Sequence, residues 1–145
     1  MDADPNWAPA VVQFAQAVAT ALLSSVGPDD VSPQTFNIDL YNPGTNVVLP
    51  NLAFSPVAVQ AAFIRYSVYR NSSSETLSEA GDIVVVYNPT NPVGNLWEIS
   101  REKTGDAQVS FSITDQGQMQ ISMTAIPGTD YNANVFYAAQ AMLTG

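Results

Sequence analysis

The chain has 145 residues, a net charge of −9, and neither cysteine nor histidine. The missing residue types exclude a disulfide framework, a catalytic thiol and an imidazole base, and they remove the commonest zinc ligands. Four basic residues are too few to form the cationic surface that nucleic acids or anionic membranes require. Because 46% of the residues are apolar, a chain of single-domain size can bury a substantial core, and the low charged fraction of 12% suits a protein packed in an assembly.

The first predicted element is an α-helix over residues 7–26, which Gly27-Pro28 ends. Polar residues recur along it at helical spacing, and another face carries an apolar stripe: Trp7, Val11, Phe14, Val18 and Leu22. The preceding residues are acidic, which argues against a secretory signal, and the polar stripe argues against a membrane span. Two interpretations stay open. The helix packs on its own domain, or it contacts copies of itself or another subunit.

After the linker at residues 27–34, the hydrophobic period changes to two, which is typical of β-strands. Strands are predicted at residues 36–40, 47–50, 57–70, 83–88, 96–102, 107–114, 117–124 and 134–143. The apolar side switches at Phe63-Ile64, which predicts a bulge or a change of sheet. The sequence "DQG" at residues 115–117 predicts a hairpin turn. The Ser-rich, acidic stretch at residues 71–82 is interpreted as a soluble connection between two strands.

The predicted fold is therefore all-β: an antiparallel sandwich or barrel of about eight strands, preceded by one N-terminal α-helix. Residues 1–33 would form a helical arm and linker, and residues 34–145 the β-sandwich domain.

No motif indicates catalysis. A serine nucleophile would lack its histidine base, so paired carboxylates are the remaining option: Glu75, Glu79 and Asp82, or Glu98 and Glu102. Strand alternation places Glu98 and Glu102 together on an outer face, where a solvated surface is the simpler interpretation. No stretch has the oxygen spacing of a calcium loop. We expect neither an enzyme nor a cofactor or metal.

Carbohydrate binding is a stronger alternative, because five aromatic residues could stack on sugars if exposed: Tyr69, Tyr87, Trp97, Tyr131 and Tyr137. Tyr87 and Trp97 occupy apolar positions of alternating runs, which favours core packing for both.

Residues 63–143 resemble a jelly-roll module that recurs in bacteriophage virion proteins. The resemblance is carried by "IRYSVYR" (64–70), "EAGDIVVVYN" (79–88), "TGDAQVSFSITDQGQMQIS" (104–122) and "FYAAQAML" (136–143). It implies a jelly-roll sandwich with a structural role, as in capsid decoration proteins, tail-fibre tips or adaptors. It also implies association as trimers or dimers, and it offers no catalytic residues to transfer.

The function predicted from these observations is that of a phage capsid decoration, or cement, protein on the outer capsid surface. It would stabilise the shell by binding across subunits of the major capsid protein, as a homotrimer or alternatively a dimer. The apolar stripe of the helix would contact the capsid or other copies. The alternative is a tail-fibre or adaptor domain that recognises a glycan or a protein, with loop aromatics such as Tyr131.

Overall fold

The computed structural model describes residues 29–144, which form eight strands and no helix. The predicted N-terminal helix, with its stripe of Trp7, Val11, Phe14, Val18 and Leu22, lies outside the described residues and stays a prediction. Within the described part of the chain, no helix is long and apolar enough to cross a membrane. The strands are β1 (Val31–Asn37), β2 (Gly44–Ala53), β3 (Val59–Asn71), β4 (Thr76–Tyr87), β5 (Trp97–Gly105), β6 (Val109–Ile113), β7 (Gln118–Met123) and β8 (Asn132–Leu143).

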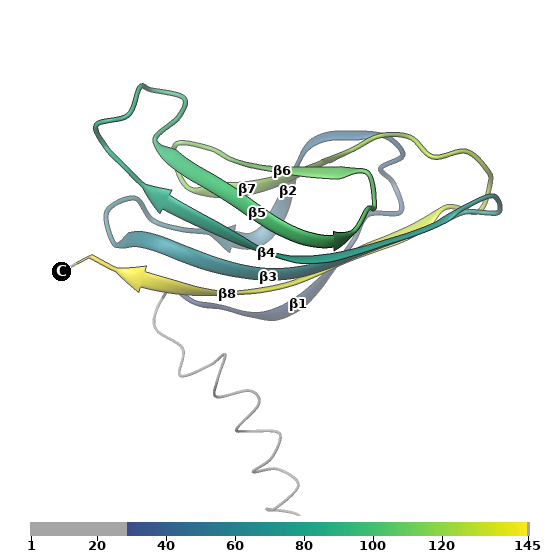
Figure 1. Ribbon diagram of the computed structural model, residues 1–145, viewed down its shortest axis with the longest axis horizontal. Helices are drawn as coiled ribbons and strands as arrows, with labels where there is room; N and C mark the ends of the chain where they lie inside the picture. The colour runs from purple at the N-terminus through teal and green to yellow at the C-terminus, as the bar shows by residue number, and fades with distance from the viewer. Residues whose placement is uncertain (1–28, 145) are drawn as a thin grey trace, which may run out of the picture.

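Two antiparallel sheets pack face to face (Figure 1). The larger sheet has the order β1-β8-β3-β4-β5, and the smaller has the order β2-β7-β6. The predicted all-β sandwich is thereby confirmed. A jelly roll is not confirmed, because the sheets hold five and three strands and β3, β4 and β5 follow one another as a meander. The first strand starts at Val31, within the segment predicted to be a linker.

The core lies between the two sheets and follows from side-chain alternation along each strand. In β7, Met119, Ile121 and Met123 are buried, whereas the residues between them face outward. Successive side chains of a strand point to opposite faces, so one face of each sheet collects the apolar residues. Large side chains from both sheets are fully buried, among them Leu49, Leu52, Ile64 and Ile83.

The turn between β6 and β7 forms as the sequence predicts. Thr114 and Gln118 close the hairpin through a backbone hydrogen bond of 3.0 Å. Gly117 has a φ of 91°, a conformation that residues with a Cβ rarely adopt. A Cβ at this position would lie 1.8 Å from the carbonyl oxygen of Phe54, so the close approach of the neighbouring chain also requires glycine.

The interpretation of residues 71–82 as a connection is wrong. β3 extends to Asn71 and β4 begins at Thr76, so the turn contains only Ser72–Glu75. The rest of the stretch is paired with β3 without interruption. The pattern misleads because the inward positions of this half of β4 carry a glutamate and a glycine, Glu79 and Gly81, in place of apolar residues.

The predicted bulge at Phe63-Ile64 is also wrong. The pairing of β3 with β4 and β8 runs regularly through both residues, and the irregularity lies between Val59 and Ala61. Ile64 points into the core, whereas Phe63 is exposed on the outer face of the five-stranded sheet. The sequence pattern switches here because both faces of β3 carry a large apolar side chain at this point.

Candidate functional site

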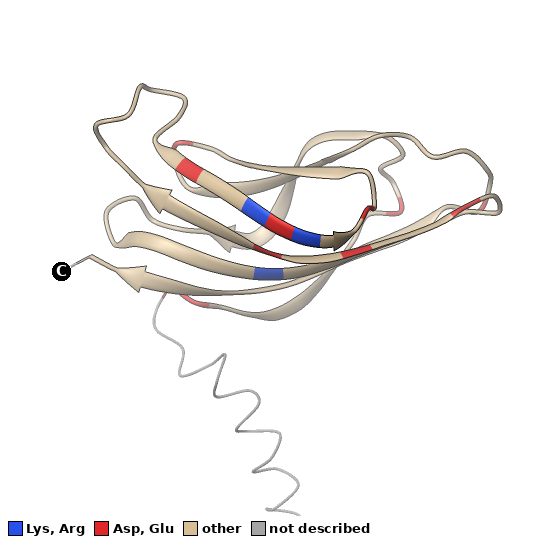
Figure 2. Ribbon diagram, viewed as in Figure 1, with Lys and Arg blue, Asp and Glu red and all other residues tan. Residues whose placement is uncertain are grey.

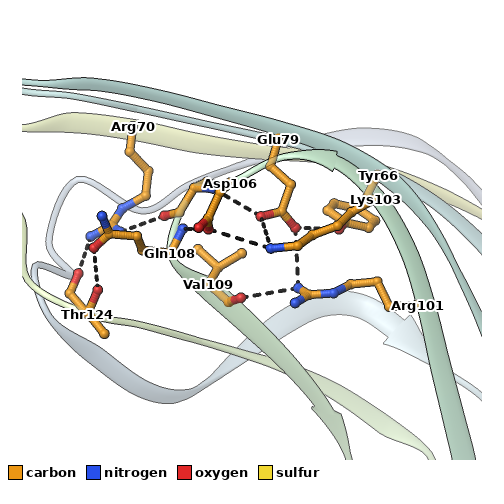
Figure 3. A network of polar contacts seen from close by, with 10 residues as sticks. Tyr66, Arg70, Glu79, Arg101, Lys103, Asp106, Gln108, Val109 and Thr124 are labelled. Carbon is orange, nitrogen blue, oxygen red and sulfur yellow. Dashed lines mark hydrogen bonds and ion pairs between the residues drawn. The ribbon is translucent and has the colours of Figure 1, made fainter.

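A buried polar network joins β3, β4 and β5 to the loop that precedes β6 (Figure 3). Its centre is Glu79 of β4, whose side chain is inaccessible to solvent. The carboxylate accepts hydrogen bonds from the hydroxyl of Tyr66 at 2.5 Å and from the backbone N–H of Ala107 at 3.0 Å. Two partly exposed cations balance its charge, Arg101 at 3.3 Å and Lys103 at 3.5 Å.

The protonation of Tyr66 is consistent with its role as a donor to Glu79. Burial of the ring raises the pKa of the Tyr66 hydroxyl above its ordinary value, and the hydrogen bond to Glu79 raises it further. The phenol is therefore neutral at physiological pH and holds one carboxylate oxygen in place.

The second buried charge is Arg70 of β3, whose relative exposure is 0%. Its guanidinium donates to the carbonyl oxygens of Ala107 at 2.8 Å and Thr124 at 2.5 Å. It also donates to the hydroxyl of Tyr131 at 2.9 Å and to Oδ1 of Asn42 at 3.3 Å. Ala107 thus contacts both buried charges: its backbone N–H donates to Glu79, and its carbonyl oxygen accepts from Arg70. This arrangement is suited to fixing the loop between β5 and β6.

Within each set considered for catalysis the carboxylates do not come together, although Asp82 of the first set and Glu102 of the second are cross-strand partners on the outer face of β4 and β5. Glu79 points into the sandwich, whereas Asp82, three residues later on the same strand, is exposed in an ion pair with Arg65. Glu98 and Glu102 share the outer face as predicted, but four residues of strand place them about 13 Å apart. That separation exceeds the roughly 5–9.5 Å that glycoside hydrolysis requires.

No group of three or more His, Cys, Asp or Glu side chains able to hold a metal ion occurs among residues 29–144.

The aromatic residues considered for sugar stacking are mostly engaged inside the fold. The Tyr131 hydroxyl accepts from Arg70, and the guanidinium lies 5.5 Å from the centre of its ring. Tyr137 is buried and donates to the carbonyl of Pro50 at 2.7 Å. Trp97 is buried as predicted and packs against half-buried Tyr87. Only Tyr69 of this set is exposed, at 40%. These positions argue against an aromatic sugar platform at a loop end.

A different surface stands out: the outer face of the five-stranded sheet. Phe63 of β3 and Phe136 of β8 are 45% and 53% exposed. The strand register places Val84 directly opposite Phe63, and Met142 and Val86 on either side of Ala61. We call this set the outer apolar face: Phe63, Val84, Val86, Phe136 and Met142.

A groove of about 940 Å³ runs over this face and is lined by residues from β1, β3, β4 and β8. Phe63, Val84 and Phe136 form part of its lining, and Pro33 of β1 contributes to its border. The alternation rule missed this surface because it assigns apolar side chains to the core. Its signal in the sequence is the loss of alternation in "AAFI" (61–64) and "IVVV" (83–86), where neither face of the strand is polar.

Charges lie mainly at one side of the same sheet. Figure 2 shows basic and acidic residues alternating along the edge strand β5. Glu98 and Glu102 of this strand belong to the outer face through their pairing with β4. Nearer the centre, Arg65 and Asp82 form an exposed cross-strand ion pair at 3.2 Å.

The outer face of the three-stranded sheet has a different character. It carries the uncharged residues Ser110, Ser112, Gln120 and Ser122, with one exposed apolar residue, Val48. Within the described residues, the two outer faces of the sandwich are therefore unequal, one apolar and one polar.

Neither a protein family nor a curated protein matches this chain in sequence. Two solved structures are similar to it in part. The tailspike protein of Acinetobacter phage vB_ApiP_P1 has 14% identity and a TM-score of 0.44, over 76% of this chain and 22% of that one. The tailspike protein of Acinetobacter baumannii phage AM24 has 9% identity and a TM-score of 0.34, over 80% of this chain and 26% of that one. The chain thus spans about a quarter of either protein. Both TM-scores are below 0.5, so these likenesses assign no function to this chain.

Proposed function

We propose that this chain is a non-enzymatic structural module of a bacteriophage virion, of the tail-fibre or adaptor type, and that it acts by binding protein. The observation that carries the proposal is the outer apolar face, where Phe63 and Phe136 stand exposed above a groove. Contiguous exposed apolar surface with a rim of polar and charged residues marks protein interaction sites. The phage context comes from the resemblance of residues 63–143 to a virion module.

The inequality of the two outer faces supports a tail-fibre or adaptor role over capsid decoration. A cement protein that straddles neighbouring capsid subunits needs contact surface on two sides. In the described part of the chain, Leu40, Val57 and Val93 are exposed in loops. Within the sheets, exposed apolar side chains gather on the five-stranded sheet, whereas the three-stranded sheet presents serine and glutamine. One apolar face suits a module that attaches to a partner at one side.

A protein is a better ligand for this surface than a glycan. Tyr131, the loop aromatic suggested for sugar binding, is held by Arg70. The exposed aromatic rings instead lie on a sheet face, Phe63 beside Val84 and Phe136 beside Ser67, where they can fill the pockets of another protein.

The proposal is tested by binding the full-length chain to tails and to expanded capsids, purified separately from the phage that carries it. We expect retention by tails and at least a tenfold loss of affinity for Phe63→Asp. Val48→Asp places the same charge on the other outer face and should bind like wild type. Retention by capsids alone would support the cement function instead, and retention by neither fraction would refute a virion role.

A further inference from the structure

We propose that the protein that binds the outer apolar face has a basic contact surface, which places arginine or lysine side chains against Asp82, Glu98 and Glu102. The inference rests on the proposed function, because it names the chemistry of the partner for the surface on which that function depends. Apolar contacts with Phe63 and Phe136 would hold the partner, and the carboxylates would select it by charge.

The charged side chains of this outer face lie at its centre and along one edge. Arg65 of β3 and Asp82 of β4 form the exposed central ion pair at 3.2 Å. Glu102 and Glu98 lie on the edge strand β5, opposite Asp82 and Val86 of β4. The strands on the other side, β1 and β8, contain no charged residue. The strands of this face therefore present three carboxylates and one cation, and the excess negative charge lies along β5.

The other three basic residues of the chain do not neutralise this excess, because they are directed to the inner side of the sheet. Arg70 is fully buried. Arg101 and Lys103 alternate with Glu102 along β5 and form ion pairs with the buried carboxylate of Glu79. Among residues 29–144, the Glu102 side chain has no hydrogen bond or ion pair of its own. Its charge is available to a partner.

The pairing of Glu102 with Asp82 favours the binding of a cation. Residues directly opposite each other on antiparallel strands have Cβ atoms about 4.5–5.5 Å apart, and like charges at such positions are destabilising. Arg65 forms an ion pair with Asp82 and leaves Glu102 uncompensated. A partner cation beside Glu102 relieves this repulsion, whereas an apolar or acidic contact would desolvate the carboxylate without a counter-charge.

A second hollow, of about 400 Å³, has room for such a cation beside the apolar groove. Glu102 and Asp82 line it together with Arg65 and Lys103. The two cations are already paired, Arg65 with Asp82 and Lys103 with Glu79, so Glu102 is the uncompensated charge of the hollow. Arg65 and Asp82 also line the apolar groove, so the hollow and the groove form one continuous contact surface.

The strand register gives the spacing that the partner must match. Phe63 lies two residues from Arg65 along β3, and Glu102 lies two strands away in the row of Arg65 and Asp82. With about 6.7 Å for two residues and about 4.8 Å between strands, Phe63 and Glu102 are about 12 Å apart. The partner should therefore present an apolar side chain and a cation at this separation.

The test is the rate of binding of the full-length chain to immobilised tails, purified from the phage that carries it, in about 50 to 500 mM sodium chloride. Attraction between exposed opposite charges speeds association and is screened by salt. We expect wild-type association to slow at least about fivefold over this range. Glu98→Gln/Glu102→Gln should associate at least about fivefold more slowly than wild type at the lowest salt concentration and should lose most of the salt dependence.

Two further variants separate the charge of the face from other effects. Glu75→Gln/Asp130→Asn also removes two negative charges, from the turn after β3 and the loop before β8, and should bind like wild type. Phe63→Ala keeps every charge and removes an apolar contact, so it should speed dissociation and leave the salt dependence of association unchanged. Circular dichroism melting verifies that each variant is folded.

Three results would overturn the inference. They are association that does not depend on salt, association that salt accelerates, as for an acidic partner or a second copy of this chain, and equal slowing by the two double variants. If binding to tails still depends on Phe63, each of these results leaves the proposed function standing. Retention by capsids alone would refute the tail assignment, and the same variants measured on capsids would then confirm or overturn the basic partner. Retention by neither fraction would refute both proposals.

Discussion

Glu79 and Arg70 are two charged side chains that the sandwich buries, and each is satisfied by partners from several strands and loops. Burying an ionised group is costly unless hydrogen bonds and opposite charges replace its water. Glu79 has two cations and two neutral donors, and Arg70 has four neutral acceptors. Substitution of either residue should therefore cost more than the loss of one contact.

Glu79→Gln should lower the free energy of unfolding by about 2 kcal/mol. Breaking a fully buried ion pair costs about 3–5 kcal/mol. The smaller loss is expected here because Arg101 and Lys103 are partly exposed. The amide keeps the shape of the side chain but leaves the two cations without their counter-charge. Urea denaturation measures the change. Glu98→Gln on the exposed face of β5 is the matched control and should change stability by less than about 0.5 kcal/mol. Equal effects of the two substitutions would contradict the assignment of the network.

Arg70→Lys should destabilise the protein by about 3 kcal/mol, because an ammonium cannot reach four acceptors that surround a planar guanidinium. The control is Arg65→Lys, where the side chain is 83% exposed and a change below about 0.5 kcal/mol is expected. Thermal melting of the two variants gives the comparison. A stable Arg70→Lys protein would mean that the carbonyl of Ala107 does not depend on the guanidinium.

The raised pKa of Tyr137 predicts that the protein loses stability at alkaline pH. Burial raises its pKa to about 12 from an ordinary value of 10.0. Below pH 10 the phenol is protonated in both states, so its contribution to stability is complete. Between pH 10 and 12 the unfolded chain loses the proton and the folded chain keeps it, so stability falls as the pH rises.

Tyr137→Phe should therefore be less stable than wild type by about 1 kcal/mol at pH 7, because the hydrogen bond to Pro50 is lost. At pH 11 the difference between the two proteins should shrink, since phenylalanine has no proton to lose. Urea denaturation at the two pH values measures this, and a constant difference would disprove the role of the buried phenol.

At the scale of single strands, β4 shows how the polar network and the sheet depend on one glycine. A Cβ on Gly81 would lie 2.3 Å from the carbonyl oxygen of Glu102 and 3.0 Å from the hydroxyl of Tyr66. Gly81→Ala would push β5 away from β4 and displace the tyrosine from Glu79. We expect a loss of about 2–3 kcal/mol by urea denaturation. Ala80→Ser, on the exposed face next to it, should be nearly neutral, and a neutral Gly81→Ala would contradict the close contact of β4 with β5.

The sequence predicts strands well where alternation is clean and polar residues face water. The β6–β7 hairpin is the clearest case, because Met119, Ile121 and Met123 alternate and Gly117 marks the turn. The start of β4 could not be found in this way, since Glu79 is acidic and yet buried. Only its distant partners, such as the N–H of Ala107, make that position acceptable.

The assignment of strands to sheets depends on pairing between distant segments. β1 pairs with β8 although about 100 residues separate them, and one sequence does not specify such a partner. The candidate site was missed for a related reason. Alternation alone does not tell which side of β3 and β8 faces the core, and only the register and the burial show that Phe63 and Phe136 stand on the outer side of the sheet.

At the scale of the whole molecule, the proposed function rests on the inequality of two surfaces. The five-stranded sheet presents apolar side chains, and the three-stranded sheet presents serine and glutamine. A protein whose outer faces differ in this way has a defined orientation when it binds. The capsid cement function predicted from the sequence requires contacts across neighbouring capsid subunits, and between the two sheets of the described residues only the five-stranded one presents an apolar outer face.

The positions of the four basic residues have a consequence for kinetic stability. Trypsin cuts after lysine and arginine, and these residues all lie within β3 and β5. A protease needs an unpaired stretch of chain, so the first cut must wait until the five-stranded sheet opens. The rate of tryptic loss should then report that opening and rise with urea. Rapid cutting after Arg101 in native buffer would instead show that the edge strand detaches alone.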